Sequence, residues 1–301
     1  MNDKILNINR FLNAYRRKTV YFKTHSGNAA EAVIGLSAIR LFERNGINYK
    51  FADWDSDLSG ETVFFGGGGN LIKNSVHSAK FISKCHARVK ELVLLPQTID
   101  GNEELLSSLG SNVIVFCRER KSYEYIKTYS QIKSVFLTDD LAFDLDLNQN
   151  LIRQNSPNTI VRIAPSKTVL KALIKKQKTP NFFVRRIDVS KTLNAFREDG
   201  EIAGYDLPDG NIDLSFWCNQ KVEMLSRSVV KESSARLIST INKFDVIRTD
   251  RLHIAIVAAK LDKRVDLFNN NYENNKNVFD YSIKGVFPKV TWKGSLNESA
   301  E

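Results

Sequence analysis

Short apolar runs alternate with helical patterns along the first half of this chain, and no other feature constrains the fold as much. Runs with the composition of buried strands lie at residues 21–23, 49–52, 62–65, 92–95, 113–117 and 135–137. Helical patterns separate several of them, at residues 32–45, 75–89 and 122–129. Strands that are separated by helices pair in parallel, so the pattern predicts a doubly wound α/β domain.

The second half of the chain is expected to form another unit of the same kind. It has a predicted strand at residues 182–188, a long helical pattern at 220–242, and a strand–turn–helix–strand pattern at 244–271. A chain of 301 residues with 42% hydrophobic residues is long enough for two cores. The polar stretch 144–154 and Pro157 are the predicted linker. The expected organisation is an N-terminal Rossmann-like domain at 1–148, a C-terminal one at 149–290, and a tail at 291–301.

The turn within residues 244–271 is the predicted site of chemistry. Thr249 and Asp250 follow a strand and are both suited to cap the next helix, while Arg251 and His253 lie beside them. A helix N-terminus presents free N–H groups and the positive end of its dipole. The turn is therefore predicted to bind a phosphate or a carboxylate. The simpler alternative is that Arg251 pairs with a nearby acid and that His253 is a hydrogen-bonded interior residue.

The string T-D-R-L-H, followed by a helix and by Asn270-Asn271-Tyr272, resembles the C-terminal signature of the polysaccharide pyruvyltransferase family. Further strings resemble that family in the same order along the chain: residues 26–31 its G-N-x-G-D, 64–70 its strand and glycine loop, 95–98 its P-Q-S, 117–122 its R-D-x-x-S, and 183–188 its R-x-D strand. Ala30 and Ile254 stand where the family commonly has glycine.

The resemblance implies transfer of a pyruvyl group from phosphoenolpyruvate to a sugar of a surface polysaccharide or its lipid-linked precursor, forming a pyruvate ketal. It implies two Rossmann-like domains facing a cleft, similar to GT-B glycosyltransferases. His253 and Arg251 would be catalytic, with Arg186 as the second cation for the donor. The residues that the resemblance implies for substrate binding also include Leu252, Gly67, Gly68, Asn70 and Asn28. The scheme requires no metal and no cofactor, because phosphoenolpyruvate is itself a substrate.

The glycine run at residues 66–69 does not indicate a nucleotide-binding motif. It lacks the Lys-Ser/Thr of a P-loop, and Leu71 stands where the third glycine of a dinucleotide fingerprint would fall. Glycines at the end of a strand instead indicate that the backbone comes very close to another segment or to a ligand. Asn70 is expected to start the helix that follows.

The net charge of +10 is concentrated in one segment. Residues 151–197 contain eleven basic residues and the single acid Asp188. Within that segment, residues 166–178 have the pattern of a helix with an apolar face and flanking lysines, which suits an anionic membrane surface. An ordinary solvated helix is the alternative. Nucleic acid is not the expected partner, because no recognised nucleic-acid module accompanies the charge.

The expected location is the cytoplasm, either free or attached to the inner face of the cell membrane. Three scattered cysteines favour a reducing compartment, and the N-terminus lacks the features of a signal peptide. Two other functions remain open from the sequence. One is a glycosyltransferase that uses a nucleotide sugar on the same architecture, and the other is a non-catalytic member of a polysaccharide assembly complex.

Overall fold

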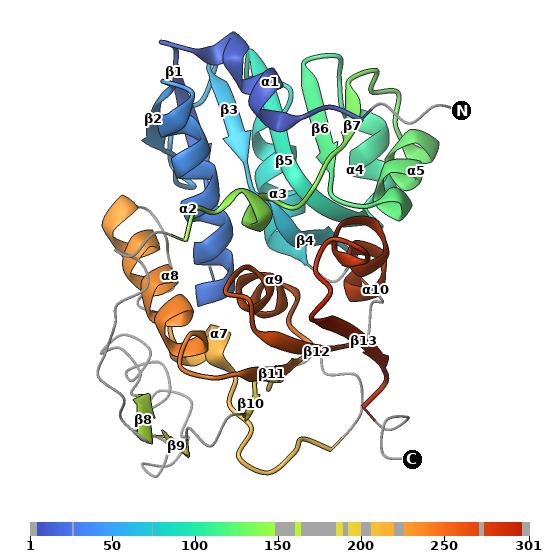
Figure 1. The fold of residues 1–301 in the computed structure, drawn as a ribbon. Helices are drawn as coiled ribbons and strands as arrows, with labels where there is room; N and C mark the ends of the chain where they lie inside the picture. Colours follow the sequence, from blue (N-terminus) through green and yellow to red (C-terminus); the bar gives the residue numbers. More distant parts are fainter. Residues whose placement is uncertain are drawn as a thin grey trace, which may run out of the picture. The chain divides into compact units, whose positions relative to one another are not determined.

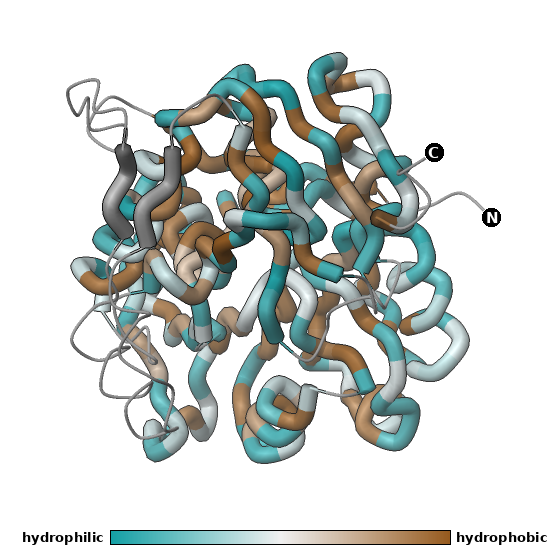
Figure 2. The backbone as a smooth tube through the Cα atoms, turned by 90° about the horizontal axis from the view of Figure 1, so that it is seen from below, coloured by the Kyte–Doolittle hydropathy of each residue, from teal (hydrophilic) through white to brown (hydrophobic). Residues whose placement is uncertain are grey.

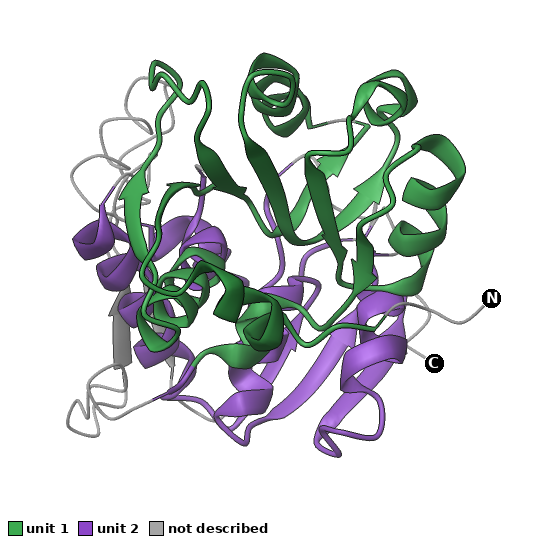
Figure 3. Cartoon of the chain, turned by 90° about the horizontal axis from the view of Figure 1, so that it is seen from above, with its two compact units in different colours: residues 1–25, 34–145 green, residues 26–33, 146–301 purple. Residues whose placement is uncertain are grey.

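A computed structural model of the chain describes residues 5–25, 27–73, 75–147, 160–163, 185–188, 192–199, 206–219, 226–270 and 274–296 (Figure 1). The chain forms an α/β fold with parallel sheets, as predicted. It splits into two compact units (Figure 3), of which unit 1 is Met1–His25 with Ile34–Leu145, and unit 2 is Ser26–Val33 with Asp146–Glu301. The helix predicted at 166–178 and residues 148–154 of the predicted linker lie outside the described residues.

Unit 1 contains a seven-stranded sheet with the order β2-β1-β3-β5-β6-β7, and β4 also pairs with β5. Its strands are β1 (Thr19–Lys23), β2 (Asn48–Phe51), β3 (Thr62–Phe65), β4 (Gly68–Ile72), β5 (Glu91–Asp100), β6 (Val113–Cys117) and β7 (Val135–Leu137). All neighbours run parallel, for example Tyr21 opposite Val63. Each predicted strand of this half is confirmed. The chain order reverses between β1 and β3, where open α/β sheets usually bind ligands at the carboxyl ends of the strands.

Helices precede, connect and follow these strands. They are α1 (Ile8–Leu12), the 3-10 helix η1 (Asn13–Tyr15), α2 (Ala29–Arg44), α3 (Val76–Cys85), α4 (Glu103–Ser108), α5 (Arg120–Tyr129) and the 3-10 helix η2 (Leu141–Asp144). The start of α2 is fixed by Asn28, whose side-chain oxygen accepts from the N–H groups of Ala30 at 2.9 Å and Glu31 at 3.2 Å. The first turn of α2, through Val33, belongs to unit 2 and the rest of the helix to unit 1.

The core of unit 1 lies between the sheet and α2. The rings of Phe22 and Phe64 each meet Phe42 edge to face, with centroids 5.2 Å apart in both pairs. All three rings are fully buried. Figure 2 shows hydrophobic and hydrophilic segments alternating along the tube, within helices as well as between them. The apolar periodicity of the sequence thus corresponds to the buried faces.

The glycine run continues as the strand β4 and not as a helix starting at Asn70, while the helical pattern at 75–89 is confirmed by α3, which begins at Val76. Gly66 and Gly67 have φ angles of 73° and 102°, which turn the chain so that the following residues pair with β5. A Cβ on Gly66 would lie 2.6 Å from His25 Nε2, and one on Gly67 would lie 2.8 Å from the Ile34 side chain. The close approach predicted for these glycines is therefore to other segments of the protein.

Unit 2 contains a four-stranded parallel sheet with the order β10-β11-β12-β13. Its strands are β10 (Thr192–Asn194), β11 (Val246–Thr249), β12 (Arg264–Phe268) and β13 (Val290–Gly294). Its helices are α7 (Leu214–Trp217), α8 (Arg227–Ile241), α9 (Leu252–Lys260), α10 (Asn274–Val278) and the π-helix η4 (Phe279–Ile283). The predicted strand, helix and strand at 244–271 are confirmed. Residues 291–294, expected in the tail, belong instead to β13.

A separate antiparallel pair, β8 (Ile160–Ile163) and β9 (Arg185–Asp188), also lies in unit 2. The described part of the strand predicted at 182–188, residues 185–188, therefore forms a strand, but it is not a member of the four-stranded parallel sheet. Helix α9 packs on β11 and β12 of that sheet (Figure 1). Every residue of α9 from Leu252 to Ala259 is buried, which explains why its sequence is apolar on all sides.

Candidate functional site

The turn between β11 and α9 is held by side chains that were expected to cap the helix. The Thr249 hydroxyl accepts from the Arg251 N–H at 3.0 Å and donates to the Ala195 carbonyl at 2.7 Å. Asp250 accepts from the backbone N–H of Arg197 at 2.9 Å. Both residues thus fasten the turn to the segment after β10. The N-cap position is taken by Arg251, and no side chain in the described part of the chain caps α9.

An uncapped helix N-terminus leaves backbone N–H donors at the positive end of the helix dipole. Helix α9 presents such a terminus, with Arg251 at its N-cap position and His253 in its first turn. The predicted proximity of a cation and an imidazole to the start of this helix is thus present in the fold. Its geometry is suited to an anion.

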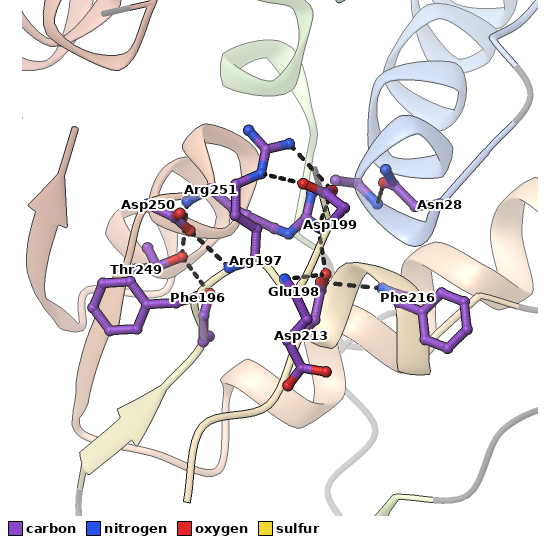
Figure 4. Close-up of polar contacts among 12 residues, drawn as sticks. Asn28, Phe196, Arg197, Glu198, Asp199, Asp213, Phe216, Thr249, Asp250 and Arg251 are labelled. Atoms are coloured by element: carbon purple, nitrogen blue, oxygen red, sulfur yellow. Dashed lines mark hydrogen bonds and ion pairs between the residues drawn. The ribbon is translucent and has the colours of Figure 1, made fainter. Parts of the chain in front are cut away.

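Arg251 is held by two carboxylates from distant parts of unit 2 (Figure 4). One guanidinium nitrogen lies 2.8 Å from Asp199 Oδ2 and also donates to Asp213. Asp213 itself is almost fully buried, and it accepts from the N–H groups of Glu198 at 3.2 Å and Phe216 at 3.4 Å. The simpler alternative for Arg251, pairing with a nearby acid, is therefore correct in part. The Nε of Arg251 is buried and has no hydrogen-bond partner among the described residues.

The charge of Arg251 is secured by its surroundings. Burial acts to lower its pKa, but the negative charges of Asp213 and then Asp199 outweigh that effect, so the pKa of the guanidinium is raised. Arg251 is therefore a fixed cation that remains charged wherever the protein is folded. It cannot act as the proton donor of a reaction, and its role is electrostatic.

Arg197 is a second arginine in the same cluster, and it was not among the residues predicted from the sequence. It follows β10, the neighbour of β11, and its Nε lies 2.9 Å from Asp199 Oδ1. The string Arg197-Glu198-Asp199 has the same R-x-D sequence pattern that was assigned to residues 186–188. An apolar strand directly before that string was the signal that could have identified it. The R-x-D pattern occurs four times in the chain, at 186–188, 197–199, 248–250 and 264–266. The copy whose arginine shares the Asp199 carboxylate with Arg251 is the one at 197–199.

Arg186 lies in β9, where it pairs with Arg162 across the antiparallel ladder. Only its backbone is described, so its proposed contact with the donor remains a prediction. It does not belong to the sheet that carries Arg251. For the cluster that is described, Arg197 takes the position of second cation.

Leu252 and His253 open α9, and both are buried. His253 is 7% exposed and lies two residues from the Arg251 cation. Asn28 belongs to the same unit as Arg251, and its side-chain oxygen is engaged at the start of α2. The Gly27 carbonyl next to it accepts a hydrogen bond from Asn219, which fixes this loop within unit 2. The binding roles proposed for Leu252 and Asn28 remain predictions.

The remaining predicted residues, Gly67, Gly68 and Asn70, lie in unit 1. They neighbour a buried polar cluster at the carboxyl end of its sheet, where Arg118 pairs with Asp140 at 2.7 Å and donates to Thr98 at 2.9 Å. Gln97 is fully buried in this cluster, and its amide has no partner among the described residues. Gln97 lies in the string 95–98 that resembles the P-Q-S of the family, but it was not among the predicted site residues. These residues therefore form a second polar region, separate in sequence from the arginine turn.

The asparagine-rich segment after β12 supports the arginine turn from its other side. The amide of Asn275 donates to the carbonyl of Asp250 and, at 2.9 Å, to that of Phe268. A single side chain thereby joins the end of β11 to the end of β12. Asn270 is buried, whereas residues 271 and 272 of the matched string lie outside the described residues.

Comparison with known proteins gives a family and a related structure. The model of the polysaccharide pyruvyl transferase family matches residues 25–272. Among solved structures, an uncharacterised protein from Klebsiella pneumoniae subsp. pneumoniae is similar, with a TM-score of 0.75 and 28% sequence identity over 97% of this chain and 99% of that one. No curated protein sequence matches the chain significantly.

Proposed function

The chain belongs to the polysaccharide pyruvyl transferase family, and we propose that it transfers the pyruvyl group of phosphoenolpyruvate to two hydroxyls of one sugar. The product would be a cyclic pyruvate ketal on a surface polysaccharide or on its lipid-linked precursor. The observation that carries the proposal is the pair of buried arginines, Arg197 and Arg251, beside the uncapped start of α9. A substrate with a carboxylate and a phosphate suits two fixed cations and a helix N-terminus.

His253 supplies the acid-base chemistry of the proposed reaction. It donates a proton to the methylene carbon of phosphoenolpyruvate, which makes C2 electrophilic, and the first sugar hydroxyl then adds to C2. His253 takes the proton that this hydroxyl loses. The second hydroxyl adds as the C2–O bond to phosphate breaks, and its proton leaves with the phosphate. Two O–H bonds, the C2–O bond to phosphate and the π bond between C2 and the methylene carbon break, while one C–H bond, two C–O bonds and one O–H bond on phosphate form.

The arginine pair gives the first test of the donor. Replacing Arg251 or Arg197 by lysine keeps the charge and removes the planar fork, so each substitution should weaken phosphoenolpyruvate binding by about 1–3 kcal/mol. Calorimetric titration measures this change. Arg264→Lys, at the exposed amino end of β12, is the matched control and should bind like wild type. If both Arg251→Lys and Arg197→Lys bind normally, the donor anion sits elsewhere.

A thermal-shift comparison separates this proposal from a glycosyltransferase and from a non-catalytic partner. Phosphoenolpyruvate should stabilise the protein because a ligand that binds only the folded state raises its melting temperature. A panel of nucleotide sugars should not. Stabilisation by a nucleotide sugar alone would favour the glycosyltransferase, and stabilisation by neither would favour a non-catalytic role.

Attachment to an anionic membrane is a further part of the proposal, because a lipid-linked acceptor would be presented there. No helix within the described residues is long and apolar enough to cross a bilayer. Support comes from the eleven basic residues of 151–197. Replacing Lys171, Lys175 and Lys178 by glutamine should release most of the protein from anionic vesicles, since each lysine near the surface contributes about 1 kcal/mol. Co-sedimentation measures the effect. Binding that ignores both added salt and these substitutions would contradict it.

A further inference from the structure

The carboxylate of Asp199 lies between the two guanidinium groups of the site (Figure 4). One of its oxygens is 2.9 Å from Arg197 Nε, and the other is 2.8 Å from Arg251 and 3.4 Å from a second nitrogen of Arg197. A carboxylate that bridges two arginines has the geometry with which such a pair binds a small organic acid. In this arrangement the protein supplies the carboxylate itself.

The two acids that hold Arg251 differ in how firmly each is anchored. The Asp213 side chain is 4% exposed, caps α7 and accepts from two backbone N–H groups besides Arg251. The Asp199 side chain is 44% exposed. A half-exposed carboxylate regains water when it leaves its partners, whereas a buried one would lose hydrogen bonds that nothing replaces. Asp213 is therefore the permanent partner of Arg251, and Asp199 is the exchangeable one.

The charges of the cluster also indicate that Asp199 is the exchangeable partner. The guanidinium groups of Arg197 and Arg251 are already close to Asp199 and Asp213, and Asp250 holds the backbone of Arg197. Adding an anion to this group would bring negative charge against negative charge in a region of low solvent exposure. Removal of Asp199 from the arginines relieves that repulsion and leaves both cations available.

We propose that Asp199 occupies the place that a ligand carboxylate takes on Arg197 and Arg251, and that the ligand binds by displacing it into solvent. The identity of the ligand rests on the proposed function, under which it is the carboxylate of phosphoenolpyruvate. The exchange itself requires only an organic acid of that size. It also means that the resting site carries no excess positive charge that would hold other cellular anions.

Asp199→Asn tests the exchange, because asparagine keeps the shape of the side chain and removes its charge. Calorimetric titrations with phosphoenolpyruvate and with pyruvate are run on wild type and variant. Both ligands should bind the variant roughly three- to thirty-fold more tightly, the range expected for removing two partly exposed ion pairs that compete with the ligand. Asp199→Ser should also tighten the binding of both ligands, and it replaces Asp199→Asn in the test if the asparagine variant does not fold.

The matched control is Asp262→Asn, whose side chain is 82% exposed and pairs with Lys289 outside the site. It should leave both affinities unchanged. Unchanged or weaker binding of both ligands to the Asp199 variants would overturn the exchange and make Asp199 a residue that positions the arginines. If phosphoenolpyruvate binds neither protein but pyruvate binds the variant more tightly, the exchange holds and the proposed donor fails. If phosphoenolpyruvate binds the wild type and the Asp199 variant equally tightly, phosphoenolpyruvate remains the donor and the exchange is overturned.

Discussion

Replacing His253 by alanine is expected to lower turnover by about two to four orders of magnitude, the usual loss when a general acid or base is removed. Binding of phosphoenolpyruvate should change little, because the arginine pair supplies the attraction for the donor anion. The protein should also fold, since alanine has the highest helix propensity and position 253 lies in the first turn of α9. The expected loss is thus in the chemical step.

Phosphate release, followed with a sugar acceptor present, measures turnover, and calorimetry measures donor binding. His77→Ala is a suitable control because His77 is an exposed histidine on α3, in the other unit. It should leave turnover unchanged. A folded His253→Ala protein with near-normal turnover would remove His253 from the mechanism, and the search for the acid would then move to the polar cluster around Gln97 in unit 1.

Much of the fold was predictable because the apolar residues that become buried recur at regular intervals along the sequence. The strands of unit 1 and the unit from β11 to β12 are short apolar runs between helical patterns, and each appeared where expected. Strand β4 was not predicted, because its run of glycines has no apolar period and forms a strand only by pairing with β5. Residues 291–294 of β13 were assigned to a tail, although residues 290–293 alternate between apolar and polar side chains. Its place depends on the exposed edge of β12 that it covers.

The site was predictable where its residues are neighbours in the sequence. Arg251 and His253 stand two residues apart at the start of an apolar helix, so their chemistry could be inferred from that string alone. The acids that hold Arg251 lie 52 and 38 residues before it, and no local pattern connects them to it. They are brought to the turn by the pairing of β10 with β11 and by the loop that leads to α7.

The second arginine of the site could not be identified from the R-x-D pattern alone, because identifying it requires the strand pairing. The strings at 186–188 and 197–199 both read R-x-D after an apolar run. Of the strands that carry or precede these two strings, β10, which precedes Arg197, is hydrogen-bonded to β11, whereas β9, which contains Arg186, pairs with β8. Parallel neighbours end at the same edge of a sheet, so the residues that follow them meet. Choosing among the copies of the R-x-D pattern in the chain required knowledge of which strands pair.

Asp213→Ala is expected to lower the stability of the protein by about 3–5 kcal/mol, the usual cost of removing one partner from a buried ion pair. Arg251 would keep its charge while almost fully buried, and the start of α7 would lose its cap. Asp199→Ala removes the other acid from the same guanidinium. Because Asp199 is 44% exposed, its loss should cost at most about 1 kcal/mol. Urea and thermal unfolding of both variants measure the difference.

A double variant separates the buried charge from the lost cap. Asp213→Ala combined with Arg251→Met leaves no unpaired cation in the interior, so most of the lost stability should return even though the cap is still missing. If the double variant is as unstable as the two single losses added together, the pair contributes nothing as a pair. Equal losses for Asp213→Ala and Asp199→Ala would likewise contradict the division between an anchored and an exchangeable acid, since a carboxylate that the fold requires cannot give way to a ligand.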